Sequence, residues 1–140
     1  MEMGFDNEIM GENENNVVEL KTMRAPFTLW QVGKEEYKLR LTASVISKLE
    51  QKWKRNLMVY LFSDGIPTIS DMLTVVQAAM SQYHHGISFQ RVQEIFDEYV
   101  NQGGDQNKFM VEVIVPLLEV SGFFTQDQVA SLNEEIQTLV

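Results

Sequence analysis

Residues Tyr83–Phe124, YHHGISFQRVQEIFDEYVNQGGDQNKFMVEVIVPLLEVSGFF, decide the fold of this chain. Glycine, serine and aspartate mark the limits of two helices inside the stretch. Ser88 is a preferred N-cap residue, and Gly103-Gly104 end the helix that it begins. Asp105 caps the next helix, for which Gly122 is the C-terminal glycine. The stretch therefore predicts two capped helices joined by a short loop.

The two helices differ in how their apolar residues are distributed. The first has charged residues on one face and, on the other, an apolar stripe at helical spacing, made by Val92, Ile95, Phe96 and Tyr99. The second is apolar almost all round between 106 and 121, which is typical of a helix that is central in a core or covered by a partner. Pro116 lacks an amide hydrogen, so it is expected to kink this second helix.

Three helices and a hairpin are predicted before this stretch. Apolar spacing indicates helices over residues 42–55, 56–62 and about 70–82, the first capped by Thr42 and the third by Thr68 or Ser70. Period-two alternation over residues 27–41, around a turn containing Gly33, indicates a β-hairpin. The predicted fold class is mainly α: a small helical domain of about five helices, with an N-terminal β-hairpin and a flexible acidic N-terminal tail.

Both ends of the chain differ from this central domain, which we place at residues 25–124. Residues 1–24 form a polar, acidic segment without periodicity, so they cannot bury enough apolar surface to offset ordering, and disorder is predicted before Val17. Residues 125–140 begin with capping-box spacing from Thr125 to Gln128 and continue with an apolar stripe. They predict a short terminal helix.

Charge and composition argue against several classes of function. The net charge is −9, and residues 1–19 hold six acids without a base, so general affinity for nucleic acid is not expected. Seven of the eleven bases lie between Lys34 and Arg55, a cluster more typical of a solvated face than of a nucleic-acid site. There are no cysteines, so disulfides and thiolate metal sites are excluded, which suits a reducing cytosol.

No membrane span or targeting segment is expected. The longest apolar candidate, Val111 to Val120, contains Glu112, Pro116 and Glu119. It falls short of the roughly 18 uninterrupted apolar residues that a span needs. The first residues are acidic where a targeting segment would be basic, so a cytoplasmic location is expected.

No catalytic, metal or cofactor site is predicted. The two histidines, His84 and His85, are adjacent at a helix end and point in different directions, so packing or hydrogen bonding there is expected. Glu94 and Glu98 share a helix face opposite the apolar stripe, where nothing would desolvate them for acid–base chemistry. Gly103-Gly104 lacks the lysine and the preceding strand of a phosphate loop.

Large flexible and aromatic side chains near the ends of helices are candidates for contact with a partner or a second copy. Such side chains suit surfaces that bind extended or helical segments, although core filling is the competing interpretation for each of them. The candidates are Met58, Phe62, Phe109, Phe123 and Phe124.

Five segments, taken in order, resemble one family: the small tail assembly chaperones of long-tailed phages or prophages of Gram-positive type. They are VGKEEYKLRLT at 32–42, ISKLE at 46–50, YHHGIS at 83–88, FDEY at 96–99 with the two glycines after it, and VSGFF at 120–124. The resemblance covers about residues 27–124. It marks as structural motif residues Gly33, His85, Gly86, Ser88, Asp97, Tyr99, Gly103, Gly104 and Gly122.

This resemblance implies a protein without catalytic residues that acts in the cytoplasm of a bacterial host. Its expected partners are the tape measure protein, the tail tube protein, a longer frameshifted form of itself and further copies of itself. It would be present during assembly and absent from the finished virion. The acidic segment 1–24 is longer than the family's usual start, and residues 125–140 are an extension or part of the region used in frameshifting.

Other functions stay open at this point. One is a different phage morphogenesis protein, such as a head–tail connector or a tail terminator, which would remain in the particle. Another is a regulatory helical module that uses the Lys34–Arg55 face on nucleic acid. An enzyme is the least expected class, because no nucleophile with its base can be assembled from the sequence.

Overall fold

The computed structural model describes residues 23–124, together with Ser131 and Glu134, which are both helical. Two strands come first, β1 (Thr28–Val32) and β2 (Glu35–Leu39). Four helices follow: α2 (Ala43–Trp53), α3 (Leu57–Phe62), α4 (Ile69–Met80) and α5 (Phe89–Asn101). The described core ends with a composite helix made of α6 (Gln106–Phe109), the π-helical turn η1 (Met110–Ile114) and α7 (Val115–Val120).

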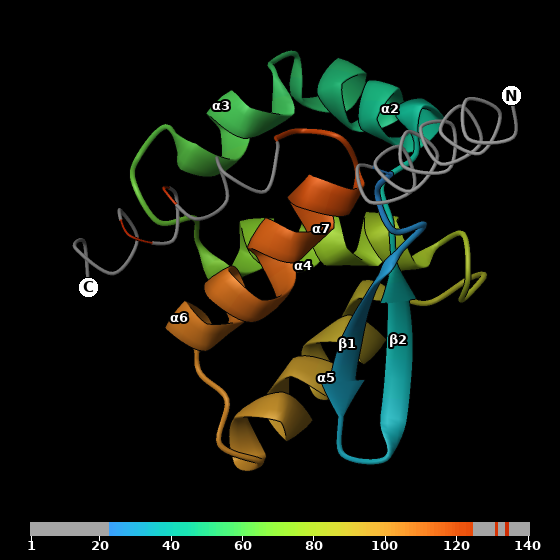
Figure 1. Ribbon diagram of the computed structural model, residues 1–140, viewed down its shortest axis with the longest axis vertical. Coiled ribbons are helices and arrows are strands. Elements are labelled where there is room, and N and C mark those ends of the chain that lie inside the picture. The colour runs from blue at the N-terminus through green and yellow to red at the C-terminus, as the bar shows by residue number, and fades with distance from the viewer. Residues whose placement is uncertain (1–22, 125–130, 132–133, 135–140) are drawn as a thin grey trace, which may run out of the picture.

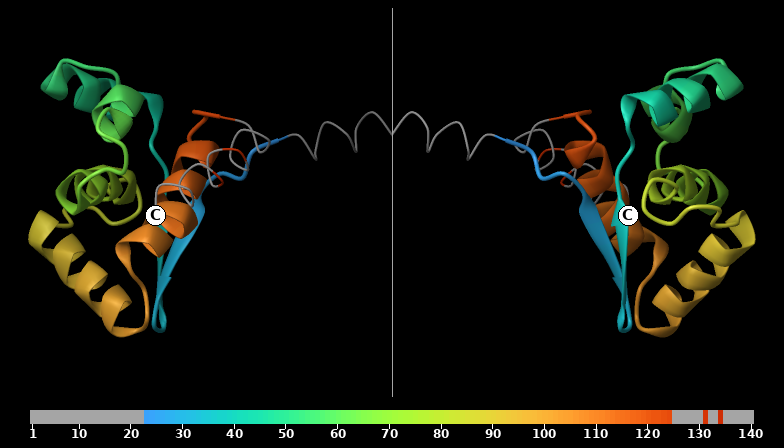
Figure 2. Two further views of the ribbon diagram at one scale, coloured as in Figure 1. Left: turned by 90° about the vertical axis from the view of Figure 1, so that its left-hand side faces the viewer. Right: turned by 90° about the vertical axis from the view of Figure 1, so that its right-hand side faces the viewer.

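These elements form two layers with the core between them. The hairpin and the composite helix lie on one side, and α4 with α5 lies on the other (Figure 2). α2 and α3 lie together at one end of the molecule, whereas α5 lies at the opposite end (Figure 1). The mainly helical fold with an N-terminal hairpin agrees with the prediction from the sequence.

The hairpin has a two-residue turn. β1 and β2 pair antiparallel in a register that sets Val32 opposite Glu35 and Thr28 opposite Leu39. Gly33, at the first turn position, has a φ of 64°, which favours glycine over other residues. The register turns Trp30, Val32 and Leu39 toward the core, so the hairpin is held by the helices beneath it.

Side chains cap the start of each of five helices. The oxygens of Thr42, Ser88 and Asp105 accept hydrogen bonds from first-turn amides of α2, α5 and α6, as predicted. Thr68 caps α4, which decides between the two predicted candidates. Asn56 accepts from the amides of Met58 and Val59 and so starts α3 separately from α2.

The last helix contains a π-helical turn immediately before its proline. Val115 donates its backbone N–H to the carbonyl of Met110, five residues earlier. Pro116 has no N–H and crowds the preceding turn, and a π-helical turn is a common accommodation for such an interruption. The interruption before Pro116 takes the form of this turn, and the helix continues through to Val120.

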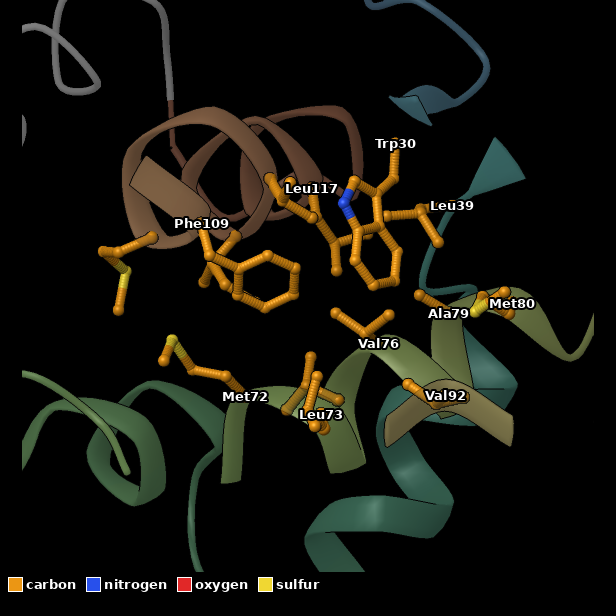
Figure 3. Packing of buried hydrophobic residues seen from close by; sticks show 14 of the residues in the cluster. Trp30, Leu39, Met72, Leu73, Val76, Ala79, Met80, Val92, Phe109 and Leu117 are labelled. Carbon is orange, nitrogen blue, oxygen red and sulfur yellow. The ribbon is translucent and has the colours of Figure 1, made fainter. Parts of the chain in front are cut away.

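Aromatic rings meet in the centre of the core, where Figure 3 shows Trp30 and Phe109 facing aliphatic side chains of α4 such as Val76. Trp30 from β1 and Phe109 from α6 are in edge-to-face contact, with ring centroids 5.1 Å apart. Phe109 also meets Phe96 at 5.1 Å, and it is fully buried. The prediction that Phe109 contacts a partner is therefore wrong, because its ring is enclosed by the layers of its own chain.

Some predictions concern parts of the chain outside the described residues. The acidic segment 1–24 falls outside except for Met23 and Arg24, which are exposed. Of the predicted terminal helix over 125–140, only Ser131 and Glu134 are described. Within the described part of the chain, no helix combines the length and the apolar character needed to cross a membrane.

Candidate interaction surface

α2 carries an apolar stripe that the rest of the protein covers only in part. Val45, Ile46, Leu49 and Trp53 lie at helical spacing, yet no residue of α2 is buried. An amphipathic helix normally stabilises a fold by burying such a stripe. Here the four side chains pack against the core only in part, so some of the stripe stays in contact with solvent. We refer to residues 43–62, which form α2 and α3, as the arm.

α3 divides into an anchored face and an open face. Leu57 and Leu61 are buried and fix the helix to the core. Val59, on another face, is 50% exposed, and Met58, Tyr60 and Phe62 are half-buried. The two leucines are thus the fully buried contacts of α3, while Met58, Tyr60 and Phe62 pack against the core in part and remain partly accessible to a partner.

Local contacts join α3 to α2. The Glu50 carboxylate accepts a hydrogen bond of 2.8 Å from the backbone N–H of Leu57. The rings of Trp53 and Tyr60 are stacked, with centroids 3.7 Å apart and planes inclined by 9°. Because these contacts bridge the turn between the helices, α2 and α3 are expected to move as one unit.

A second set of contacts joins the arm to the body. The Tyr60 hydroxyl donates a hydrogen bond of 2.5 Å to Asp71 in the first turn of α4. Burial, and then the hydrogen bond and charge of Asp71, raise the pKa of Tyr60 to about 12. The phenol therefore stays neutral and keeps donating across the physiological pH range.

The charge of the arm is opposite in sign to that of the whole chain. Lys48, Lys52, Lys54 and Arg55 are exposed, and within the described residues none of the four forms an ion pair. Lys54 ends α2 in the left-handed conformation, with a φ of 55°. The arm thus combines open apolar surface with positive charge in a protein of net charge −9.

The predicted contact residues fall into two groups. Met58 and Phe62 lie on α3, within the arm. Phe123 and Phe124 follow α7 and are half-buried against the core. The Ser121 hydroxyl accepts a hydrogen bond of 2.9 Å from the backbone N–H of Leu41, which brings the segment after α7 to the base of the arm. Apart from Phe109, the predicted residues thus lie on the arm or in a segment that reaches its base.

Several of the motif residues have structural roles that their positions explain. An added Cβ on Gly104 would lie 2.4 Å from the ring of Tyr99, so no larger residue fits there. Tyr99 donates to Glu112 at 3.4 Å, and burial, followed by the charge of Glu112, raises its pKa to about 12. His85 and Asp97 are exposed, while Gly33, Gly86, Gly103 and Gly122 adopt positive φ.

His84 packs at the end of α4, and its buried Nε2 has no hydrogen-bond partner among the described residues. Its ring meets that of Tyr37 edge to face, with centroids 5.4 Å apart. Its backbone N–H donates to the carbonyl of Met80 at the end of α4. Across the described residues, no group of three or more histidines, aspartates and glutamates is arranged to hold a metal ion.

The sequence did not reveal two contacts that hold the arm in place. The Tyr60 hydroxyl of α3 bonds to Asp71 of α4, and the Glu50 carboxylate of α2 accepts from the backbone N–H of Leu57 at the start of α3, so each contact joins two different helices. The sequence offered one signal in this region: Asn56 is a good N-cap residue, which indicates that α3 begins as a helix separate from α2.

The fold and this surface define a small helical domain that presents a partly exposed apolar arm. The chain belongs to a family of unknown function, DUF6096, whose model matches residues 23–138. No curated protein matches the chain, and no solved structure matches it.

Proposed function

We propose that this protein is a tail assembly chaperone of a long-tailed phage or prophage. In this role it binds the tape measure protein in the cytoplasm of the bacterial host and keeps it from aggregating. The tail tube then polymerises around the tape measure protein, and the chaperone leaves before the virion is complete. The ordered resemblance over residues 27–124, which spans both layers and the arm, supports this assignment.

The open arm is the single observation that carries the proposal. A tape measure protein is expected to be long, helical and apolar in places, so its exposed apolar segments would aggregate unless another protein binds them during assembly. Half-buried methionine and aromatic side chains suit that task, because they adapt to different helical partners. Met58, Tyr60 and Phe62 supply such side chains on α3, beside the exposed Val59.

Weak contacts at the arm are compatible with release. Several copies coating one long target would hold it through many small contacts, and each copy would leave as tube subunits replace it. The net charge of −9 would keep the complex in solution through mutual repulsion. The mechanism needs non-covalent contacts only, so no catalytic or metal-binding residue is assigned.

Co-expression with the tape measure protein tests the proposal. That protein is identified by gene order, as the product of a very long gene soon after this one, with a tail tube gene just before it. We expect an affinity-tagged chaperone to capture it and to increase its soluble fraction. A folded chaperone that captures no folded tape measure protein would refute the proposal.

Two valines supply a matched pair of variants for this experiment. Val59 on the arm is 50% exposed, and Val100 on α5 is 43% exposed. We expect Val59→Ser to reduce capture and Val100→Ser to leave it unchanged. Mass spectrometry of purified virions then separates this function from that of a head–tail connector or tail terminator, since those proteins remain in the particle in stoichiometric amount.

A further inference from the structure

Two grooves run beside α5, and their lining residues lie outside the arm. The first, of about 550 Å³, lies between the starts of α4, α5 and α6, and Leu73 and Phe96 contribute its apolar lining with Ile69 and Phe89. The second, of about 300 Å³, lies between the hairpin and α5 and includes Val32, Tyr37 and Ile95. Glu94 lines both, so the two grooves adjoin along one helix.

The rims of the two grooves are acidic. Glu94 and Asp97 line the first groove, and Glu35, Glu94 and Glu98 line the second. Arg91 is the single base among the lining residues, and its guanidinium already lies 3.6 Å from the Glu94 carboxylate. Four acids against one base leave the lining with a net charge of −3, so it favours a cationic ligand.

The N-terminal ends of α4 and α6 at the first groove do not change its preference for a cationic ligand. N-terminal amides of a helix attract anions, but Thr68 and Asp105 already accept hydrogen bonds from first-turn amides of α4 and α6. Gln90, Gln93 and Gln106 add neutral amide groups to the lining, which can donate to or accept from the backbone of a bound segment.

We propose that the α5 grooves bind a cationic amphipathic segment of a partner protein. Its apolar side chains enter the first groove over Ile69 and Phe89, which are partly exposed, and its lysine or arginine side chains pair with Glu94, Asp97 and Glu98. This site uses no residue of the arm and goes beyond the proposed function, since it adds a second partner segment of opposite charge preference. Nucleic acid is disfavoured as the ligand, because its phosphates would meet the same four acids.

A designed peptide of known charge tests this site directly. The probe is an 18-residue helix of leucine and lysine, and the reference is its leucine–glutamate counterpart. Nuclear magnetic resonance of the full chain should place shift changes from the lysine peptide on α5 and the first half of α4. The lysine peptide should bind at least tenfold more tightly than the glutamate peptide, and raising the salt concentration should weaken it.

A pair of charge variants provides the control. Glu94→Gln combined with Asp97→Asn removes two exposed carboxylates from the grooves, and Glu36→Gln combined with Asp64→Asn removes two exposed carboxylates elsewhere. We expect the first double variant to weaken lysine-peptide binding roughly five- to tenfold, as for the loss of two exposed ion pairs, and the second to change it less than twofold.

Several outcomes would overturn the proposal. They are equal binding of the two peptides, shift changes centred on the arm, or the same loss of affinity in both double variants. Concentration-dependent shifts on α5 without any peptide would mean that a second copy occupies the grooves, which also contradicts it. Because the probe is not the tape measure protein, failure here leaves the capture experiment on the arm unaffected.

Discussion

α2 and α4 have similar lengths and each carries an apolar stripe, broader in α4, yet the protein uses them differently. α4 buries six of its twelve residues, whereas α2, with eleven residues, buries none. α4 lies between the hairpin, α5 and the composite helix, while α2 lies at one end of the molecule (Figures 1 and 2). Amphipathic spacing thus predicts which face of a helix turns inward, but the position of the helix decides how much of that face is covered.

The largest expected difference between the core and the arm follows from removing a buried aromatic ring from the core. Phe109→Ala should lower the free energy of unfolding by about 3–5 kcal/mol, because it removes a fully buried ring from contact with Trp30 and Phe96. Trp53→Ala in the arm should cost less, because that ring is only partly buried, and about 1 kcal/mol of its loss is the stack on Tyr60. Urea unfolding followed by circular dichroism measures both. Equal losses would mean that the arm is part of the core.

The next effect comes from the close approach of Gly104 to Tyr99. Gly104→Ala should cost about 1–3 kcal/mol, since the new Cβ overlaps a buried ring. Gly65→Ala, in the loop between the arm and α4, meets no atom within 4 Å and has a φ of 90°, so it carries only the backbone strain of about 1–2 kcal/mol. Thermal unfolding of both variants separates overlap from strain. A tolerated Gly104→Ala would contradict the packing of Tyr99.

Two tyrosines provide a smaller test, one in each region. Tyr60→Phe should cost about 1 kcal/mol, because its hydrogen bond to Asp71 is 2.5 Å long. Tyr99→Phe should cost about 0.5 kcal/mol, because its hydrogen bond to Glu112 is 3.4 Å long. The reverse order would show that the arm is held chiefly by its leucines.

The same tyrosines predict a dependence on alkaline pH. Each pKa is raised from 10.0 to about 12, so the folded state favours the neutral phenol. The resulting stabilisation is fully present below pH 10 and is lost as the pH rises through 12. Chemical unfolding at a series of pH values should show a shallower decline for either phenylalanine variant than for the native protein. A parallel decline in all three proteins would be inconsistent with these pKa values.

The smallest effect on stability is expected at the exposed valines. Val59→Ser and Val100→Ser should each change the free energy of unfolding by less than about 0.5 kcal/mol, because both side chains are already half in solvent. The two variants should differ only in capture of the tape measure protein. A large loss of stability in Val59→Ser would assign that residue to packing and not to a partner.

Much of the fold could be predicted because its signals are local. The N-caps Thr42, Ser88 and Asp105 and the glycine of the hairpin turn each act within a few residues, so they are legible in the sequence. The π-helical turn could not be predicted from the sequence. Pro116 predicted only a kink, because the form that the helix takes there depends on how neighbouring turns relax.

The candidate surface was less predictable because burial is a property of the whole fold. Phe109 and Met58 looked alike as large apolar residues near helix ends, and only the layers decide that one is enclosed and the other half-buried. The grooves beside α5 join residues that are distant in sequence, such as Ile69 and Gln106. No local pattern announces such a meeting of helix ends.

The two tryptophans of the chain are divided between the regions compared above. Trp30 is fully buried in the core, and Trp53 is partly exposed on the arm. Their fluorescence should therefore contain a blue-shifted component that an aqueous quencher such as iodide cannot reach and a red-shifted component that it can. Occupation of the arm would protect the second component alone, which gives this protein an intrinsic optical reporter of partner binding.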